Sequence, residues 1–204
     1  MSRRSAALLA AAALYALLAV LVAAGVFDRF DQWAVDTVMP GADFHNEETS
    51  LTADLVPLLD VNWSNGWHVA VNIVTLPASF LVSLALVGWR SRPLAAALAA
   101  CVAVEILCKE VLVRPALHDG FMHIEGFDGS FPSGHSLRIV LLAIAFWPLL
   151  RGWVAAWALA SLALLLLAGW HTPTDVAGGV LLGALGAGAA GALRARRLRA
   201  PAGA

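Results

Sequence analysis

The sequence predicts an all-α, polytopic membrane protein with six transmembrane helices and an outer-surface amphipathic helix after the first span. Three observations predict this fold class. Hydrophobic residues make up 60% of the 204 residues and charged residues only 13%, whereas soluble domains are about 45–50% apolar and about 25% charged. The apolar residues form long runs, and most charges lie between these runs. An ordinary soluble domain is therefore excluded.

Six apolar stretches have the length of a transmembrane helix, which needs roughly 20 residues to cross a bilayer. They are Ser5–Phe27, Gly66–Trp89, Pro93–Val113, Ser133–Leu150, Trp153–Gly169 and Asp175–Leu193. The first stretch is longer than the apolar core of a cleaved signal peptide, which has about 7–15 residues. We therefore expect it to be retained as a span.

No linker or internal repeat divides the chain, so we expect one membrane-embedded domain over residues 1–204. Its parts are a first span, an outer loop with an interfacial helix, a five-helix part with the candidate chemistry, and a basic cytoplasmic tail. In that order they cover residues 1–27, 28–65, 66–193 and 194–204.

The basic residues predict the orientation, because cytoplasmic connectors of membrane proteins are enriched in lysine and arginine. Nine of the thirteen basic residues lie at the ends that six spans would place in the cytoplasm, and no acidic residue lies there. They are Arg3, Arg4, Arg90, Arg92, Arg151, Arg194, Arg196, Arg197 and Arg199. All six histidines lie in or beside the opposite connectors. Both termini are therefore expected in the cytoplasm.

The first outer connector begins with Phe27, Phe30, Ala34 and Val38 at helical spacing, and Pro40 follows them. This pattern predicts an amphipathic helix lying on the membrane surface. Four tryptophans near the same boundary are expected to form an interfacial belt. They are Trp33, Trp63, Trp67 and Trp170.

Ionisable residues inside spans are costly, so they are candidates for function. Lys109 and Arg114 close the third span, five positions apart, and two nearby cations repel unless an anion lies between them. Glu105 precedes Lys109 by four residues, a spacing at which opposite charges attract on a helix. We expect Glu105 to neutralise and position the lysine. Anchoring of lipid headgroups is the alternative for the two cations.

The segment Pro132-Ser133-Gly134-His135 opens the fourth span. The first amides of a helix have no intrahelical partners, and with the positive end of the helix dipole they form an anion site. Gly134 allows a ligand to approach the backbone closely. Ser133 can donate a hydrogen bond, and His135 can donate a proton. An ordinary capped helix start is the alternative.

His171 and Asp175 lie four residues apart where the sixth span begins. A carboxylate on one ring nitrogen of a histidine fixes the tautomer and raises the basicity of the other nitrogen. A nucleophilic histidine needs this arrangement. The alternative is that Asp175 only caps the helix.

A metal site formed by His135, His171 and Asp175 is a further alternative, because three such ligands are typical of catalytic zinc. Three cations expected in the same neighbourhood, Lys109, Arg114 and Arg138, disfavour a divalent metal. They favour a phosphate, whose oxygens prefer charged donors. We therefore expect no metal and no cofactor.

Together these segments resemble the type 2 phosphatidic acid phosphatase family of membrane lipid phosphatases. Lys109 matches the opening lysine of the family pattern, Pro132-Ser133-Gly134-His135 matches its central motif, and His171 with Asp175 matches its closing His-x-x-x-Asp. The resemblance implies that His171 attacks phosphorus to form a phosphohistidine while Asp175 orients it. His135 would protonate the departing lipid oxygen. The phosphoryl oxygens would be held by Lys109, Ser133 and the amide of Gly134.

Two departures from the family pattern concern arginines. The Arg-Pro of the first motif usually follows after six intervening residues, where this chain has Ala116-Leu117, and Arg114-Pro115 comes two residues early. The Ser-Arg that usually precedes the closing histidine is replaced by Leu164-Leu165.

We hypothesise that Arg138 substitutes for a missing arginine, because it lies three residues after His135 on the same helix face. The alternative is that Arg138 extends to the outer headgroups.

These features predict a hydrolase that acts on a lipid phosphate or a polyprenyl pyrophosphate at the outer face of a bacterial plasma membrane. The alternatives are a phosphotransferase that uses the same histidine and a non-catalytic lipid-phosphate binder or transporter. Membrane lipids and the lipid phosphate are the expected partners, and no nucleic acid is expected. The sequence leaves the substrate's tail, its number of phosphates and the oligomeric state open.

Overall fold

The computed structural model describes residues 3–41, 63–112 and 130–199, and throughout these ranges the secondary structure is helical without a strand. The α-helices are joined by short turns, and a short 3₁₀ helix, η2, separates α4 from α5. Their bounds are α1 Arg3–Ala23, α2 Asp28–Val38, α4 Gly66–Thr75, η2 Leu76–Ala78, α5 Phe80–Arg90, α6 Arg92–Val111, α7 Gly134–Leu150, α8 Gly152–Leu167 and α9 Pro173–Arg199.

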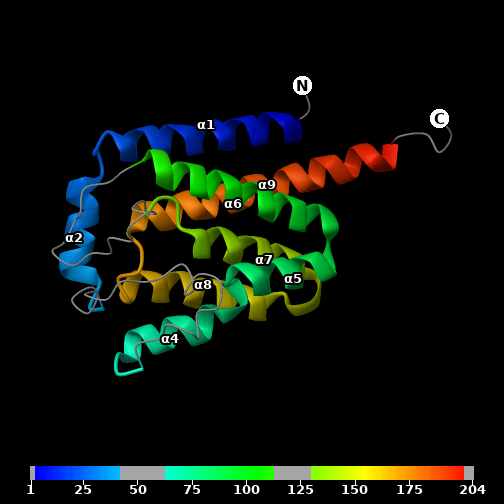
Figure 1. Cartoon of the computed structure of the whole chain (residues 1–204). Helices are drawn as coiled ribbons and strands as arrows, with labels where there is room; N and C mark the ends of the chain where they lie inside the picture. The colour runs from blue at the N-terminus through cyan, green and yellow to red at the C-terminus, as the bar shows by residue number, and fades with distance from the viewer. Residues whose placement is uncertain (1–2, 42–62, 113–129, 200–204) are drawn as a thin grey trace.

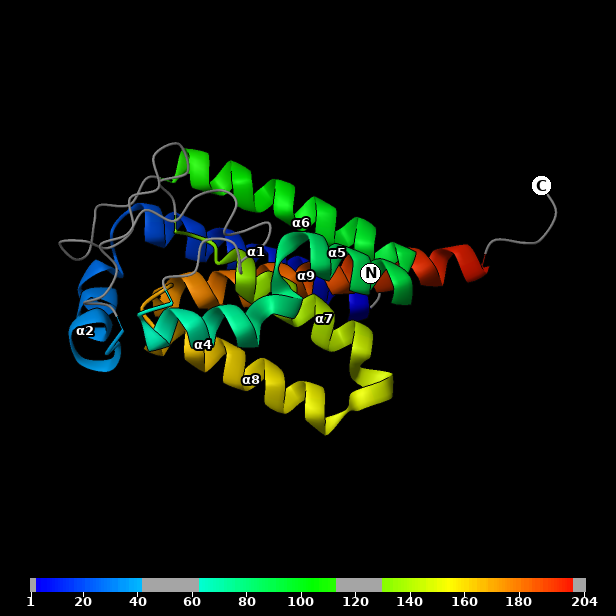
Figure 2. The same ribbon diagram turned by 60° about the horizontal axis from the view of Figure 1, so that its bottom comes forward.

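The helices form a bundle whose long members run alongside one another, with α2 lying across one end (Figure 1). The first residues of α1 and the last residues of α9 lie toward the opposite end in both ribbon views (Figure 2). The starts of α7 and α9 therefore face the same end of the bundle as α2.

Long apolar helices make this chain a membrane protein. Within residues 3–41, 63–112 and 130–199, three segments are long and apolar enough to cross a bilayer by length and composition: Ser5–Ala23, Gly66–Arg90 and Pro173–Ala195. The helices α7 and α8 are apolar but shorter, and α6 carries three charged residues near its end. The all-helical class is confirmed, and the six-span arrangement stays a prediction.

Glycines let α9 approach its neighbours closely, as small residues do at helix interfaces in membranes. A Cβ atom at Gly183 would lie 2.8 Å from the carbonyl oxygen of Leu137 in α7, and one at Gly186 would lie 2.6 Å from Sγ of Cys101 in α6. Near the start of α9, Gly178 leaves space for the buried ring of Phe131, which stacks on Tyr15 of α1. This packing fixes α9 between α1, α6 and α7.

Two predicted spans differ most from the structure. The span predicted over Gly66–Trp89 is interrupted at η2, where Pro77 has no N–H to continue the helical hydrogen bonds. The last span, predicted to end at Leu193, continues as α9 to Arg199. Residues 194–199, predicted as the start of a separate tail, are therefore part of a helix.

A helix, α2, is present where the first outer connector was predicted to form one, and its place on the membrane surface stays a prediction. Within α2, Asp31, Ala34 and Val35 are the buried residues. Phe30 and Trp33 stack on each other and are 48% and 55% exposed. The face toward the bundle therefore includes an acidic residue, which the spacing of apolar residues did not indicate.

Candidate active site

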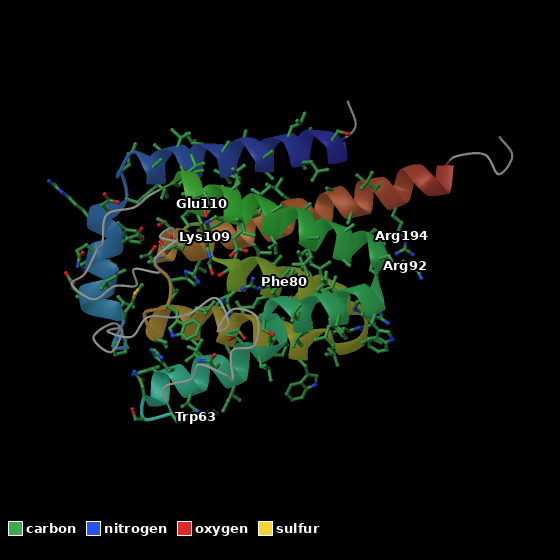
Figure 3. The ribbon with its side chains drawn as sticks, viewed as in Figure 1. Trp63, Phe80, Arg92, Lys109, Glu110 and Arg194 are labelled. Carbon is green, nitrogen blue, oxygen red and sulfur yellow. The ribbon has the colours of Figure 1, made fainter. Side chains whose placement is uncertain are left out.

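Charged residues separate to the two ends of the bundle. Lys109 and Glu110 lie at the end of α6 that is near the start of α9, whereas Arg92 and Arg194 lie at the far end (Figure 3). The candidate residues that the structure describes lie at the ends of α6, α7 and α9 that meet near Lys109. The sequence prediction that the candidate residues share one end of the bundle agrees with this arrangement.

Ser133 caps the start of α7. Its Oγ accepts a hydrogen bond from the backbone N–H of Ser136 at 3.2 Å and another from the Ser136 hydroxyl at 2.9 Å. Neither bond uses the proton of the Ser133 hydroxyl. The backbone N–H of Ser133 donates to the carbonyl of Asp175 at 3.0 Å. The start of α7 is thereby tied to the first turn of α9.

Gly134, the first residue of α7, lies against the carboxylate of Glu105 from α6. A Cβ atom at this position would overlap that carboxylate, so glycine is required by a close approach. Glu105 is buried, and its negative charge is placed where the N-terminus of a helix favours an anion. Sequence reasoning assigned the anion site to the start of α7 but did not place a carboxylate there.

Glu105 also pairs with two cations. Its Oε1 is 3.0 Å from Nζ of Lys109, as the spacing of four residues predicted, and its Oε2 is 3.8 Å from Nη1 of Arg138. Arg138 is only 3% exposed, so its side chain is buried in the bundle and does not extend to the headgroups. Lys109, Glu105 and Arg138 thus form one charged group beside Gly134, in which Glu105 and Arg138 are buried and Lys109 is partly buried.

Thr172 and Asp175 form a capping box at the start of α9, where Pro173 is the first helical residue. The Asp175 N–H donates to Oγ1 of Thr172 at 3.4 Å, and Oδ2 of Asp175 accepts from the Thr172 N–H at 3.0 Å. The same Oδ2 is 3.9 Å from Nδ1 of His171. This distance permits an ion pair and is too long for a hydrogen bond. Asp175 therefore caps the helix and also faces the imidazole.

The two histidines face each other, with ring centroids 6.3 Å apart. Trp170 lies beside them and packs edge-on against His135 at 5.6 Å and against His68 of α4 at 5.7 Å. Trp170 is 6% exposed, so its assignment to an interfacial belt was wrong. Because it directly precedes His171, this packing helps to hold the loop that carries that histidine.

Asp31 of α2 lies at the same place and is fully buried. Its Oδ1 accepts from the backbone N–H of Thr174 at 3.3 Å, and its Oδ2 accepts from the Thr174 hydroxyl. The sequence analysis placed Asp31 within the predicted surface helix and assigned it no role. A position within a helical pattern does not by itself indicate burial.

The model of the PAP2 superfamily matches residues 93–199, just over half of the chain. The chain belongs to the PAP2 superfamily. No curated protein and no solved structure matched the chain in sequence. Members of the PAP2 superfamily are phosphatases that act on lipid phosphates, so the chain is a phosphoric ester hydrolase of this general kind. The matched range covers α6 to α9, and both Asp31 and His68 lie outside it.

One residue of the proposed PAP2 site, Arg114, lies outside the described residues. The others are brought together from three helix ends: Lys109 from α6, Ser133 to Arg138 from α7, and His171 with Asp175 from α9. Across the part of the chain that the structure describes, no three His, Cys, Asp or Glu side chains are grouped to hold a metal ion.

Proposed function

We propose that the chain hydrolyses a lipid phosphate or polyprenyl pyrophosphate at the outer membrane face, without a metal, through a phosphohistidine on His171. One observation carries this proposal: His171, next to the carboxylate of Asp175, faces His135 beside a helix N-terminus and two cations. Nucleophile, proton donor and anion-binding groups are the parts that phosphoryl transfer requires.

In this proposal each nitrogen of His171 has its own role. Because Nδ1 faces Asp175, Nε2 is the nucleophile. It forms a bond to phosphorus while the bond from phosphorus to the leaving oxygen breaks. That oxygen takes a proton from His135. A water molecule then attacks the phosphohistidine, loses a proton to His135 and releases phosphate, so that both histidines return to their first states.

The phosphoryl oxygens are held at the start of α7. Ser133 donates its hydroxyl proton and Gly134 its backbone N–H, while Lys109 and Arg138 supply positive charge. Arg114 is proposed as a further cation on the basis of its sequence position. The carboxylate of Glu105 keeps Lys109 and Arg138 paired before substrate binds, and a phosphate that enters beside Gly134 competes with it for both cations.

We further propose that six spans hold this site at the outer face of a bacterial plasma membrane, with both termini in the cytoplasm. Arginines at the far end of the bundle support this orientation. The helix α2 then lies at the outer interface, with exposed Phe30 and Trp33 facing lipid headgroups. The whole chain is one domain in this proposal.

Phosphate release by the purified protein tests the proposal, measured on phosphatidic acid, phosphatidylglycerophosphate, a polyprenyl monophosphate and a polyprenyl diphosphate, with and without a chelator. We expect release from at least one lipid, unchanged by the chelator and absent in His171→Ala. Turnover that survives in His171→Ala would contradict the mechanism. Transfer of phosphate to an added alcohol in preference to water would indicate the phosphotransferase, and binding without release would indicate the transporter.

A further inference from the structure

Asp31 is a buried carboxylate that the phosphatase chemistry does not use directly. It comes from α2, outside the part of the chain that matches the family model, and it lies 143 positions before the residue it contacts. Burying a carboxylate is costly unless hydrogen bonds compensate it. Here two hydrogen bonds from Thr174, one from the backbone and one from the side chain, provide that compensation.

The hydrogen bonds of Thr174 continue toward the candidate nucleophile. The Thr174 hydroxyl lies 3.2 Å from the hydroxyl of Thr172. Thr172 in turn exchanges hydrogen bonds with Asp175, whose Oδ2 faces His171. A continuous series of polar contacts therefore connects Asp31, through Thr174 and Thr172, to the Asp175 carboxylate beside His171.

Asp31 determines the direction of these bonds. An ionised carboxylate only accepts, so the Thr174 hydroxyl gives its single proton to Asp31. The hydrogen bond between the two hydroxyls then requires Thr172 to donate to Thr174. The Thr172 oxygen is left to accept from the N–H of Asp175, which is the bond observed there.

We propose that Asp31 is a positioning residue for the reaction, which holds Thr174 and Thr172 so that Asp175 faces Nδ1 of His171. This inference rests on the proposed roles of His171 and Asp175. Docking of α2 alone would not need a carboxylate, because Ala34, Val35 and Met39 already pack against Leu166 of α8. The N-terminal part of the chain thereby contributes to a site whose reacting groups all lie in the family-matched part.

Asp31→Asn gives the first test, with Asp36→Asn as the matched control. Asparagine keeps the shape but can donate, so the direction of the hydroxyl chain is no longer determined. Asp36 lies on the same helix, is exposed and accepts a hydrogen bond from Gln32. We expect Asp31→Asn to lower kcat by roughly tenfold to a hundredfold, since a displacement near 1 Å can cost about a hundredfold in rate. KM should stay within about twofold, because the phosphate-binding residues are elsewhere. Asp36→Asn should leave both constants unchanged.

Turnover is normalised to folded protein, measured by size-exclusion chromatography and thermal unfolding, so that lost protein is not counted as lost catalysis. An Asp31→Asn protein that folds and keeps the wild-type kcat would overturn the inference. A fall in kcat matched by an equal rise in KM, or an equal effect of Asp36→Asn, would also overturn it.

A second pair of variants applies if Asp31→Asn does not fold. Thr174→Val removes the hydroxyl at nearly constant volume, and Thr174→Ser keeps it. We expect Thr174→Val to lower kcat with KM unchanged and Thr174→Ser to retain most of the turnover. Equal kcat values for the two variants would contradict the proposed chain.

The wild type and His171→Ala are measured alongside. If wild type is inactive on every lipid, or if His171→Ala is active, the proposed function fails. If both behave as proposed and Asp31→Asn still turns over normally, only the role of Asp31 fails.

Discussion

The starts of α7 and α9 lie side by side, and their polar groups are used in different ways. At the start of α9, the capping box of Thr172 and Asp175, together with Asp31, satisfies backbone and side-chain donors from within the protein. At the start of α7, Ser133 satisfies one N–H by capping, while a glycine leaves the first turn open to the Glu105 carboxylate.

This difference indicates a division of work between the two helix starts. The start of α9 is held by its own Asp175 and by Asp31 of α2, and it keeps a histidine in place. The start of α7 faces a carboxylate of α6 that is paired with two cations. A phosphate would therefore bind at α7 and be attacked from α9. Variants at each helix start test this division of work separately.

The largest effect is expected at α9, for His171→Gln. Loss of a nucleophile typically costs a factor of about a thousand or more in kcat. Glutamine keeps much of the volume of histidine, so the bundle should remain folded. Phosphate release in single and multiple turnovers measures the effect. A variant with a tenth of wild-type turnover would show that His171 is not the nucleophile.

Gly134→Ala should have the next largest effect, because its Cβ atom would overlap the Glu105 carboxylate. Moving the carboxylate or the first turn of α7 by about 1 Å is expected to lower kcat/KM by roughly a hundredfold. Gly152→Ala is the control, since nothing lies near its added Cβ atom. Equal kcat/KM values in the two variants would contradict a close approach at Gly134.

Arg138→Gln tests whether Arg138 replaces an arginine of the family pattern. A hydrogen bond to a charged group contributes about 1.5–3 kcal/mol, so kcat/KM should fall roughly tenfold to a hundredfold. Arg151→Gln, at an exposed position between α7 and α8, should change nothing. Unchanged turnover of a lipid phosphate in Arg138→Gln would disprove the substitution.

The smallest effect is expected for Glu105→Gln. This variant should bind phosphate more tightly, whereas the other variants should lose activity. The charge of Lys109, Arg138 and Glu105 together would change from +1 to +2 when the carboxylate is removed. Inorganic phosphate should therefore inhibit this variant at a severalfold lower concentration, as long as it folds. Glu110→Gln, an exposed neighbour on the same helix, is the control. Weaker inhibition by phosphate in Glu105→Gln would show that Glu105 positions the cations rather than competing with the ligand.

Several elements followed from the sequence because they depend on local chemistry. The helix predicted over Pro93–Val113 is observed as α6 over Arg92–Val111, and its ion pair between Glu105 and Lys109 followed from a spacing of four residues. The starts of α7 and α9 were also placed to within two residues, because Ser133 and Pro173 are ordinary helix-start signals.

Other features could not be predicted because they depend on which helices meet. Hydropathy predicted one uninterrupted span where the chain bends at Pro77, since a single proline hardly changes the mean hydropathy of a long apolar run. Apolar spacing predicted a surface helix in the first outer connector but did not indicate that the face of α2 toward the bundle buries Asp31. A buried acid becomes favourable only when a distant partner supplies its hydrogen bonds.

The amino-acid sequence by itself determined the membrane class, the helical segments and the three motifs with their order along the chain. These follow from apolar run length, helix-start chemistry and residue spacing, which act over a few turns. Only the tertiary structure decided that Glu105 lies against Gly134, that Trp170 packs between two histidines, and that Asp31 reaches Thr174. Each of these contacts joins different helices. Their approach is set by the packing of small residues along α9, and spacing within one helix does not specify it.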